Sequence, residues 1–505
     1  MIRSRVLVPV LRERDDRGLL HGCILQVSIA TLVIAGLGCK KPVDPGPDLQ
    51  IVDETLRLRP ADPVPRTSPW FDGHTVKLVA ARGETLGFQV LHRAAGPTTL
   101  VLPKTQVHGF EVERVEVVKP STSMYGGDSR GTGAYPDELV ASDAPATNPA
   151  YFTIDVPRDL APGHYTGELA VAAQRLPVDL EVVATTLPPL AITAWAEYHP
   201  DEIGGTIEQP GAGELACSAM FRAHGMLLAP PMNAVAYRAR IQQLADSTYV
   251  PIDLGRDPAK AASEARAWKG LLPANQHGFA IPIDEPKAKD RERVRALAET
   301  IHEANRDLIF AVTDEPRAEY GDTIDLYIPL TPKLTDTYLR WTYNGASPRA
   351  GSMVVDAPPP GMRTWGWIGW RYRIAIWYAW DALYWHDRYN HRDQPRRELH
   401  ARTNATSFDD GEEIGNLDGV LAYPAQNENV GCHASLRLEA LRRGMEDRGL
   451  LDLASACDPD RTAALAKQMI PRALGDASGS PAWPSDEAAW EDARRQLLAL
   501  ASCGH

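Results

Sequence analysis

The sequence predicts a protein of the β plus α/β class, in which an N-terminal β-sandwich precedes a (β/α)₈ TIM-like barrel and C-terminal helices. Three observations support this prediction. Short alternating apolar runs, separated by Gly and Pro, fill residues 51–190. Helix-like and strand-like segments alternate over residues 191–455, and residues 456–505 carry further helical patterns. A chain of 505 residues has room for about two or three domains of ordinary size.

The overall composition is that of a globular protein. Hydrophobic residues make up 44% of the chain and charged residues 24%, which excludes a collagen-like, coiled-coil or disordered protein. The formal net charge is −13, and no run of Lys or Arg occurs. Because affinity for nucleic acid depends on neutralising phosphates with cations, the sequence indicates no nucleic-acid partner.

Residues 1–38 have the layout of an export signal. Five Arg residues precede an apolar run from Cys23 to Leu37, which is shorter than a typical membrane span. The stretch Gly36-Leu37-Gly38-Cys39 resembles a bacterial lipobox, so we expect lipidation of Cys39 and anchoring of the exported protein to a membrane of the cell envelope. A signal anchor and plain secretion remain alternatives. Residues 39–50 are Pro-rich and predict a spacer.

The segment 51–190 has the strand spacing of a β-sandwich. Seven short alternating runs recur at intervals of roughly 8–15 residues, a spacing typical of sandwiches. The loop from Val156 to Gly167 leads into one of these strands and has the style of an immunoglobulin-like accessory domain. The paired prolines of Thr185–Leu190 cannot continue a central strand, so they mark the end of the domain.

The segment 191–455 predicts parallel strands joined by crossover helices. A helical pattern over 288–305 places Val294, Leu297 and Ile301 on one face. The length suits a (β/α)₈ barrel better than an open sheet. No GxGxxG, P-loop or GxSxG motif occurs, so the sequence gives no support for a dinucleotide site, a phosphate-binding loop or a nucleophile elbow.

Two of the predicted strands end in adjacent carboxylates. Gly278–Ile283 leads into Asp284-Glu285-Pro286, and Leu308–Thr313 leads into Asp314-Glu315-Pro316. In such barrels, catalytic residues lie at the carboxyl ends of strands. Two acids in a poorly solvated cleft do not ionise equally, which supplies a proton donor beside an anion for glycosidic bond cleavage. The same sequence is also common as a cap and turn at a strand-to-helix junction.

Aromatic residues cluster after the acidic pairs. Seven of the 12 Trp residues fall between Trp341 and Trp385. Flat rings at strand ends can stack on the apolar faces of sugars, although most Trp in a barrel fill its core. His199, His224 and Glu197 lie near predicted element ends, where structural roles are more common than substrate contact.

Four cysteines follow Cys39, and none has the spacing of a metal site. They are Cys217, Cys432, Cys457 and Cys503. Cys457 with Cys503 is a candidate disulfide between C-terminal helices, and buried free thiols are an equal alternative. The sequence indicates neither a metal nor an organic cofactor.

Several stretches in shared order resemble the glycoside hydrolase family 123 catalytic domain with its N-terminal β-sandwich, over residues 75–455. The matching stretches are Glu84–Gln89, Tyr135–Leu139, Pro162–Gly167, Asp284-Glu285-Pro286, Trp341-Thr342-Tyr343, Tyr384-Trp385, Asp418-Gly419 with Tyr423-Pro424, Ser435–Glu439 and Arg443–Asp447. The chain departs from the family pattern at Leu417-Asp418-Gly419, where Gly-Asp-Gly is frequent, and at Tyr423-Pro424-Ala425, where Tyr-Pro-Gly is frequent.

The resemblance implies a retaining β-N-acetylgalactosaminidase type of activity with substrate assistance. Asp284 would orient and stabilise the 2-acetamido group of the sugar, and Glu285 would be the general acid and then the base. The substrate-binding residues that it favours are Tyr343, Tyr384 and Trp385, with Trp341 and Trp365 as further candidates. The resemblance also implies that Asp314 and Glu315 have a rim or structural role.

Two other functions compete with this interpretation. One is a non-catalytic glycan-binding lipoprotein of the same fold, and the other is an envelope scaffold whose sandwich binds a protein. The Asp284-Glu285 pair favours the enzyme, because a binding protein does not require a proton donor beside an anion. The expected partners are therefore an oligosaccharide or glycoconjugate and, through the lipid anchor, a membrane.

Overall fold

In the computed structural model, the described residues are 46–122, 128–244, 246–331, 340–387, 397–398, 404–409, 411–425 and 431–503. The expected leader, its lipidation residue Cys39 and most of the spacer lie outside these ranges. Pro45–His505 belong to a single structural unit. Within the described ranges, no helix combines the length and the hydrophobicity that crossing a bilayer requires.

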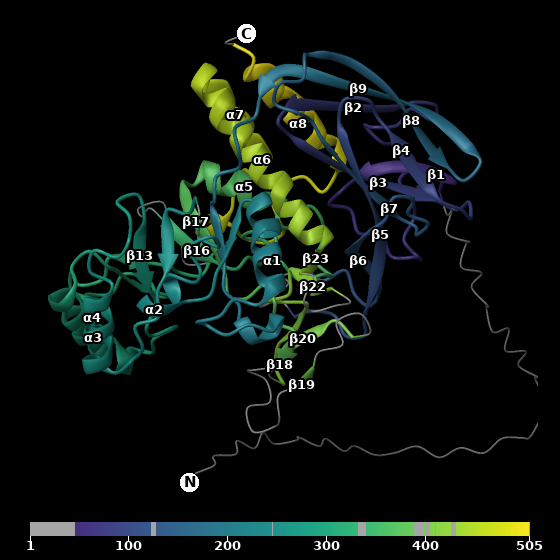
Figure 1. Ribbon diagram of the computed structural model, residues 1–505. Coiled ribbons are helices and arrows are strands. Elements are labelled where there is room, and N and C mark those ends of the chain that lie inside the picture. Colours follow the sequence, from purple (N-terminus) through teal and green to yellow (C-terminus); the bar gives the residue numbers. More distant parts are fainter. Residues whose placement is uncertain are drawn as a thin grey trace, which may run out of the picture. The chain divides into compact units, whose positions relative to one another are not determined.

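Two β-sheets form the N-terminal part, as the alternating runs predict (Figure 1). The first has the order β1-β3-β7-β5-β6 and the second β2-β9-β8-β4. Side chains from both sheets share one core, in which Phe88 and Phe152 meet Leu169 and Leu180. The strands are β1 (Leu49–Asp53), β2 (Val76–Arg82), β3 (Thr85–His92), β4 (Thr98–Val101), β5 (Gln106–Val117), β6 (Gly133–Ala141), β7 (Ala150–Asp155), β8 (Gly163–Val171) and β9 (Gln174–Thr186).

Parallel strands with helices between them follow, which confirms the α/β part of the prediction. One sheet has the order β11-β10-β17-β16 and the other β12-β13-β14-β15. The strands are β10 (Ala194–Ala196), β11 (Met226–Leu228), β12 (Tyr249–Pro251), β13 (His277–Ala280), β14 (Ile309–Val312), β15 (Leu326–Tyr327), β16 (Arg340–Tyr343) and β17 (Ile374–Ala379).

The predicted closed (β/α)₈ barrel is reproduced only in part. Over the described ranges, the two parallel sheets meet through single bridges, Met232 with Ile252 and Leu330 with Tyr343, rather than through a continuous ladder. The strands at these seams are only two to four residues long, so each seam has little backbone to pair. The structure therefore has the strand order of a barrel without continuous closure.

The crossover helices are short. In α4 the predicted stripe of Val294, Leu297 and Ile301 is buried. The N-cap of α3 is Asp257, whose carboxylate accepts a hydrogen bond from the Lys260 backbone N–H. The helices are α1 (Ala212–Ala223), α2 (Ala234–Tyr237), α3 (Pro258–Ala267), α4 (Arg291–Ala304) and α5 (Arg363–Arg371).

Short antiparallel strand pairs and three helices complete the chain. The predicted helix near Ser435–Leu453 is present as α6, and its N-cap Ser435 accepts a hydrogen bond from the Leu438 backbone N–H. Helix α6 contacts α5, α7, α8 and the sandwich (Figure 1). The elements are β18 (His386–Asp387), β19 (Arg397–Glu398), β20 (Thr406–Asp409), β21 (Ile414–Asn416), β22 (Ala422–Pro424), β23 (Cys432–Ala434), α6 (Leu436–Cys457), α7 (Pro459–Met469) and α8 (Glu487–Leu500).

All four cysteines considered above form disulfides. Cys457 pairs with Cys503, which ties the end of α6 to the residues after α8. Of the two alternatives for these cysteines, the disulfide is therefore present rather than free thiols. Cys217 pairs with Cys432, which joins α1 to β23. The second pairing could not be predicted from sequence, because the two cysteines lie 215 residues apart and flank no shared motif.

A cluster of buried charges joins α6 and α8 to the sandwich. Arg442 and Arg443 of α6 are buried against the sandwich. Arg442 Nη2 lies 2.6 Å from Glu54 Oε2, and Arg443 Nη1 lies 2.5 Å from Glu84 Oε1. Burial by itself would raise the pKa of Glu84, but the nearby guanidinium groups hold it below the ordinary value. We call the following side chains the buried ion cluster: Glu54, Glu84, Arg442, Arg443, Glu446 and Arg494.

The buried ion cluster predicts a large effect on stability when one member is removed. Arg443→Met removes a positive charge that pairs with the buried carboxylates of Glu54 and Glu84. The free energy of unfolding should therefore fall by about 3–5 kcal/mol. Chemical denaturation of the folded protein measures this loss. The matched control is Arg461→Met, whose side chain is 76% exposed beside Asp458 and should cost less than about 1 kcal/mol. Equal losses in the two variants would contradict the assignment.

Candidate active site

An open cleft of about 1410 Å³ lies at the carboxyl ends of the parallel strands. Its walls come from the residues that follow β10, β12, β13, β16 and β17. This is the edge of a β/α fold where catalytic side chains are found. The charged and hydrogen-bonding side chains on its walls include Glu197, Asp253, Arg256, Asp284, Glu285, Tyr343, Asn344, Arg349, Tyr378 and Asp418.

The two predicted acids lie side by side on the cleft, and one threonine links them. The Thr313 hydroxyl accepts a hydrogen bond from the Glu285 backbone N–H at 2.6 Å and donates one to Asp284 Oδ1 at 2.6 Å. Thr313 directly follows β14, which pairs in parallel with β13, so the two strands bring these residues to the same edge. Thr313 thus fixes both the backbone of one acid and the carboxyl group of the other.

The backbone of Glu285 is strained. Its φ is +42°, in the left-handed region that non-glycine residues rarely adopt and that costs on the order of 1 kcal/mol. Such strain persists only where surrounding contacts hold it, and it is concentrated at functional sites. The hydrogen bond to Thr313 is one contact that holds the Glu285 backbone in place.

Tyr343 also contacts the acid pair. Its hydroxyl donates a hydrogen bond to Glu285 Oε1 at 2.5 Å. Burial is the main cause that raises the pKa of Tyr343, and the Glu285 and Asp284 carboxylates raise it further. The hydroxyl therefore stays protonated and acts as a donor at neutral pH. The structure brings together three predicted site residues, Asp284, Glu285 and Tyr343, on one cleft.

The carboxyl group of Asp284 is perturbed. Burial raises its pKa above the ordinary value, and the adjacent Glu285 carboxylate adds to this increase. The Thr313 hydroxyl and the Arg256 guanidinium act in the opposite direction, because they stabilise the anion. The residue is nevertheless exposed to the open cleft, and an accessible carboxyl group with a perturbed pKa is a candidate functional group.

A second wall of the cleft combines an aromatic stack with a carboxylate. The Trp195 and Tyr378 rings stack with centroids 4.4 Å apart, and the Tyr378 hydroxyl donates a hydrogen bond to Glu197 Oε2 at 3.1 Å. Burial raises the pKa of Tyr378 well above its ordinary value, with Glu197 and Asp284 contributing. This wall places a neutral hydroxyl near the acid pair.

The outer part of the cleft is formed around Trp380, which follows β17. The Trp380 indole N–H donates a hydrogen bond to Asp418 Oδ2 at 3.0 Å, and its backbone N–H donates to Asn344 Oδ1 at 3.3 Å. Gly419 has φ +73°, and a Cβ at this position would lie 2.6 Å from the Trp380 ring. Burial raises the pKa of Asp418 to about 7. The Asp418-Gly419 pair therefore holds the Trp380 ring by a hydrogen bond and by leaving room for it.

The other four aromatic residues predicted to bind substrate are buried, and they are not among the residues that line the cleft. Trp341 packs edge-to-face against Phe279 inside the parallel strands, because its side chain points to the core between them. Trp365 lies on α5, where its ring stacks on Trp377. The Tyr384 hydroxyl donates to Asp387 Oδ1 at 3.0 Å.

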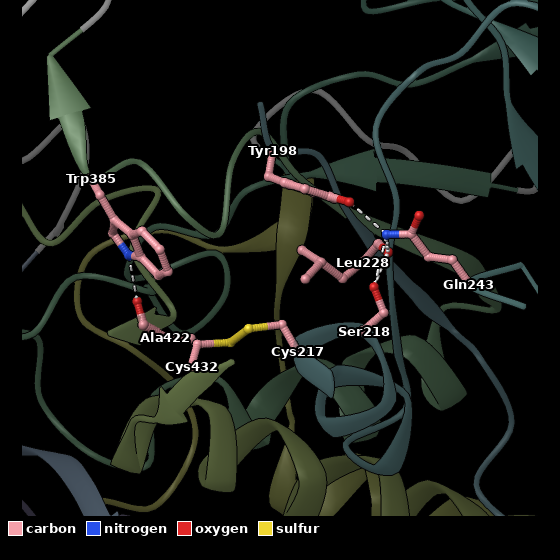
Figure 2. The surroundings of a disulfide bond; sticks show 8 residues. All are labelled: Tyr198, Cys217, Ser218, Leu228, Gln243, Trp385, Ala422 and Cys432. Carbon is pink, nitrogen blue, oxygen red and sulfur yellow. Dashed lines mark hydrogen bonds between the residues drawn. A yellow bond between two sulfur atoms is a disulfide. The ribbon is translucent and has the colours of Figure 1, made fainter. Parts of the chain in front are cut away.

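Trp385 lies beside the Cys217–Cys432 disulfide rather than on the cleft (Figure 2). Its indole N–H donates a hydrogen bond to the Ala422 carbonyl at 2.9 Å, so its polar edge is used inside the fold. The Trp residues on the cleft are instead Trp195 and Trp380. We therefore do not retain Trp341, Trp365, Tyr384 and Trp385 as substrate contacts.

The second acidic pair has structural contacts. Asp314 is buried away from the cleft, where it accepts a hydrogen bond from the Tyr320 hydroxyl at 2.8 Å and pairs with Arg291. Glu315 lies 3.3 Å from Arg317. These contacts agree with the structural role expected for Asp314 and Glu315.

The two histidines singled out in the sequence have different positions. His224 is buried, and its ring contacts the Met220 carbonyl and Glu439 Oε1, at 2.7 and 3.0 Å. His199 is exposed on the wall of the cleft. No group of three or more His, Cys, Asp or Glu side chains in the described part of the chain is arranged to hold a metal ion.

Sequence reasoning missed several side chains of the site, among them Thr313, Trp380 and Phe408. Thr313 belongs to the strand that ends in the second Asp-Glu pair, and the parallel pairing of the two strand ends was the signal that could have found it. Trp380 is one of the clustered Trp residues, and nothing in the neighbouring sequence distinguishes it from the Trp residues that are buried. Phe408 is contributed by β20, far along the chain, and nothing in the sequence points to it.

Comparison with known proteins shows a likeness only among solved structures. No family model and no curated protein matches the chain. The chain is similar to a family 123 glycoside hydrolase from Clostridium perfringens that has been described for glycolipid glycan hydrolysis. The sequences are 13% identical, the match covers 89% of this chain and 97% of the other, and the TM-score is 0.58. The predicted resemblance to family 123 is thus confirmed at the level of the fold.

Other similar structures are much more distant. A glycosyl hydrolase family 2 member from Bacteroides cellulosilyticus is 9% identical over 60% of this chain and 44% of that chain, with a TM-score of 0.25. Domains 4 and 5 of the S-layer protein SbsC are 13% identical over 22% of this chain and 49% of that chain, with a TM-score of 0.14. These two likenesses are too weak to support an argument.

Proposed function

We propose that the protein is a retaining glycoside hydrolase that cleaves β-N-acetylhexosaminides, of the β-N-acetylgalactosaminide type, by substrate assistance. The observation that carries the proposal is the cleft arrangement of Asp284, Glu285, Thr313 and Tyr343. It supplies a carboxyl group for proton transfer beside a second, hydrogen-bonded carboxyl group. The likeness in fold to a family 123 glycoside hydrolase supports it independently.

In the proposed first step, the carbonyl oxygen of the 2-acetamido group attacks the anomeric carbon while the bond to the leaving oxygen breaks. Glu285 gives its proton to that oxygen, and an oxazolinium-type ring forms on the sugar. Asp284, as a carboxylate, accepts a hydrogen bond from the acetamido N–H and stabilises the positive charge. The partial desolvation that raises the pKa of Asp284 also strengthens this attraction, because the interaction between charges increases as the surroundings become less polar.

In the second step, Glu285 takes a proton from water as the water attacks the anomeric carbon. The carbon–oxygen bond of the oxazolinium ring breaks, and the acetamido group is restored. Two displacements give net retention of configuration, and no enzyme nucleophile is required. Tyr343 holds Glu285 in place through its hydroxyl. The acid pair favours an enzyme over a glycan-binding protein, because a binding protein does not require a proton donor beside an anion.

We also propose that residues 1–38 direct export and that Cys39 is lipidated, so that the mature protein is attached to a membrane of a bacterial cell envelope. The Pro-rich stretch 39–50 would then act as the spacer between the membrane and the sandwich. The lipobox-like sequence before Cys39 supports this part of the proposal.

A panel of aryl glycosides tests the proposed reaction. The β-N-acetylgalactosaminide should be cleaved, and the plain β-galactoside should be cleaved at least about 10³-fold more slowly, because it lacks the internal nucleophile. The β-N-acetylglucosaminide reports how strongly the site distinguishes the configuration at C4. A thiazoline analogue of the oxazolinium ring should inhibit competitively. Equal turnover of the plain galactoside would refute substrate assistance, and a folded protein that cleaves none of these would favour the binding protein.

A further inference from the structure

Two half-buried aromatic rings stand at the outer part of the cleft. They are Trp380, which follows β17, and Phe408, on β20. Their ring centroids are 6.4 Å apart, with the rings nearly perpendicular. The other Phe, Tyr and Trp rings on the cleft are each at most 8% exposed and offer little area to a ligand; they are Trp195, Tyr198, Phe279, Tyr343 and Tyr378.

The position of Trp380 relative to the acid pair follows from the strand geometry. Tyr343 and Tyr378 are directly paired across β16 and β17, and Tyr343 contacts Glu285. Trp380 lies two residues further along the chain toward the carboxyl end, which is about 7 Å further out. Trp380 therefore lines the cleft beyond Tyr378, past the end of β17.

The Trp380 ring is held in place before any ligand arrives. Asp418 accepts the indole hydrogen bond at 3.0 Å, and Gly419 leaves space for the ring. Asp418 is itself only 3% exposed, so this support is part of the core. Tyr384 also packs against the ring, with centroids 5.1 Å apart, and a side chain held in this way loses little conformational freedom when a ligand binds.

We infer that Trp380 and Phe408 form a stacking subsite for the sugar ring that is joined to the terminal residue through the cleaved bond. The inference rests on the proposed function and extends it from the terminal sugar to the next one. The ligand class is a β-linked oligosaccharide whose second residue is a pyranose with an apolar face. The cleft volume of about 1410 Å³ exceeds the roughly 300–1,000 Å³ of a typical small-molecule pocket, as a site for more than one ring requires.

The test compares two substrates that share the terminal sugar. One is the disaccharide N-acetylgalactosaminyl-β-1,3-galactose, and the other is the β-azide of N-acetylgalactosamine, whose leaving group has no ring. Trp380→Ala and Phe408→Ala should each lower kcat/KM for the disaccharide by about three- to tenfold, the usual size of one aromatic contact, and change the azide less than twofold. Trp380→Phe should retain part of the effect of the ring.

Trp370→Ala is the matched control. This Trp is also half-buried, but it lies on α5 outside the cleft, so neither substrate should be affected. Thermal unfolding of each variant separates a damaged fold from a lost contact. Equal losses on the disaccharide and the azide in folded variants would overturn the subsite.

A binding measurement separates this inference from the proposed reaction. Calorimetry with the disaccharide, on Glu285→Gln and on Glu285→Gln with Trp380→Ala, reads the subsite without turnover. Weaker binding in the double variant supports the subsite even if the native enzyme hydrolyses nothing. Equal binding in the two proteins, or no binding in either, overturns it.

Discussion

Glu285→Gln should lower kcat/KM for a disaccharide substrate by about 10²- to 10⁴-fold, the range that a general acid–base group contributes. Gln has the same shape, and its side-chain oxygen can still accept the hydrogen bond from Tyr343, so the geometry of the cleft is kept. What is lost is the proton that the leaving oxygen needs and the base that the incoming water needs. Steady-state kinetics on the purified variant measures the loss.

Changing the leaving group and adding an external nucleophile test whether Glu285 acts as the acid and the base. A dinitrophenyl glycoside releases its leaving group without a proton, so its first step should be largely spared. Added azide attacks without a base, so it should restore turnover and yield the β-azide. An equal loss on both leaving groups, with no effect of azide, would show that Glu285 acts in some other way.

Asp284→Asn should lower kcat by about 10²- to 10³-fold for N-acetylhexosaminides, because the charge that stabilises the oxazolinium-type ring is removed. Asn can still accept the Thr313 hydrogen bond through its amide oxygen, so the variant tests charge more than position. Turnover of the β-N-acetylgalactosaminide under saturation measures the loss. An unchanged kcat would show that the assigned role of Asp284 is wrong.

Thr313 gives a control that alters the same carboxyl group without removing it. Asp284 must be ionised to stabilise the oxazolinium-type ring, so activity should fall at acid pH as this carboxylate becomes protonated. Because the pKa of Asp284 is raised, the fall should occur at higher pH than for an ordinary Asp. The Thr313 hydroxyl lowers the pKa, so Thr313→Val should move the acid limb of the kcat/KM profile to higher pH. Thr313→Ser should restore it. A purely structural role would lower activity without moving the limb.

The main architecture was accessible from sequence because it depends on local patterns. Alternating runs predicted the sandwich, the stripe of Val294, Leu297 and Ile301 predicted α4, and the Asp284-Glu285 pair was located by its place after a strand. In each case the deciding signal lies within about 15 residues, where periodicity and turn chemistry act.

The remainder depended on contacts that local patterns do not encode. The spacing of the Trp residues does not reveal that Trp341 points between strands while Trp380 lies on the cleft. No local pattern marks Glu446 and Asp447 as buried, yet both are. Glu446 pairs with Arg442 of the same helix, and Asp447 pairs with Arg363 of α5. Continuous barrel closure was expected from length alone, and the short strands at the seams do not provide it.

The buried ion cluster also bears on the order in which the chain is made. Glu54 and Glu84 are synthesised 388 and 410 residues before their partners Arg442 and Arg494. Until those partners arrive, the nascent sandwich holds carboxylates that water must solvate, so its surface toward α6 stays unfinished. Contacts of such long sequence separation form late in folding, when most of the loop entropy has been spent. The residues from α6 onward therefore decide whether the sandwich of residues 49–186 becomes fully stable, and a chain that stops short of α6 cannot complete this domain.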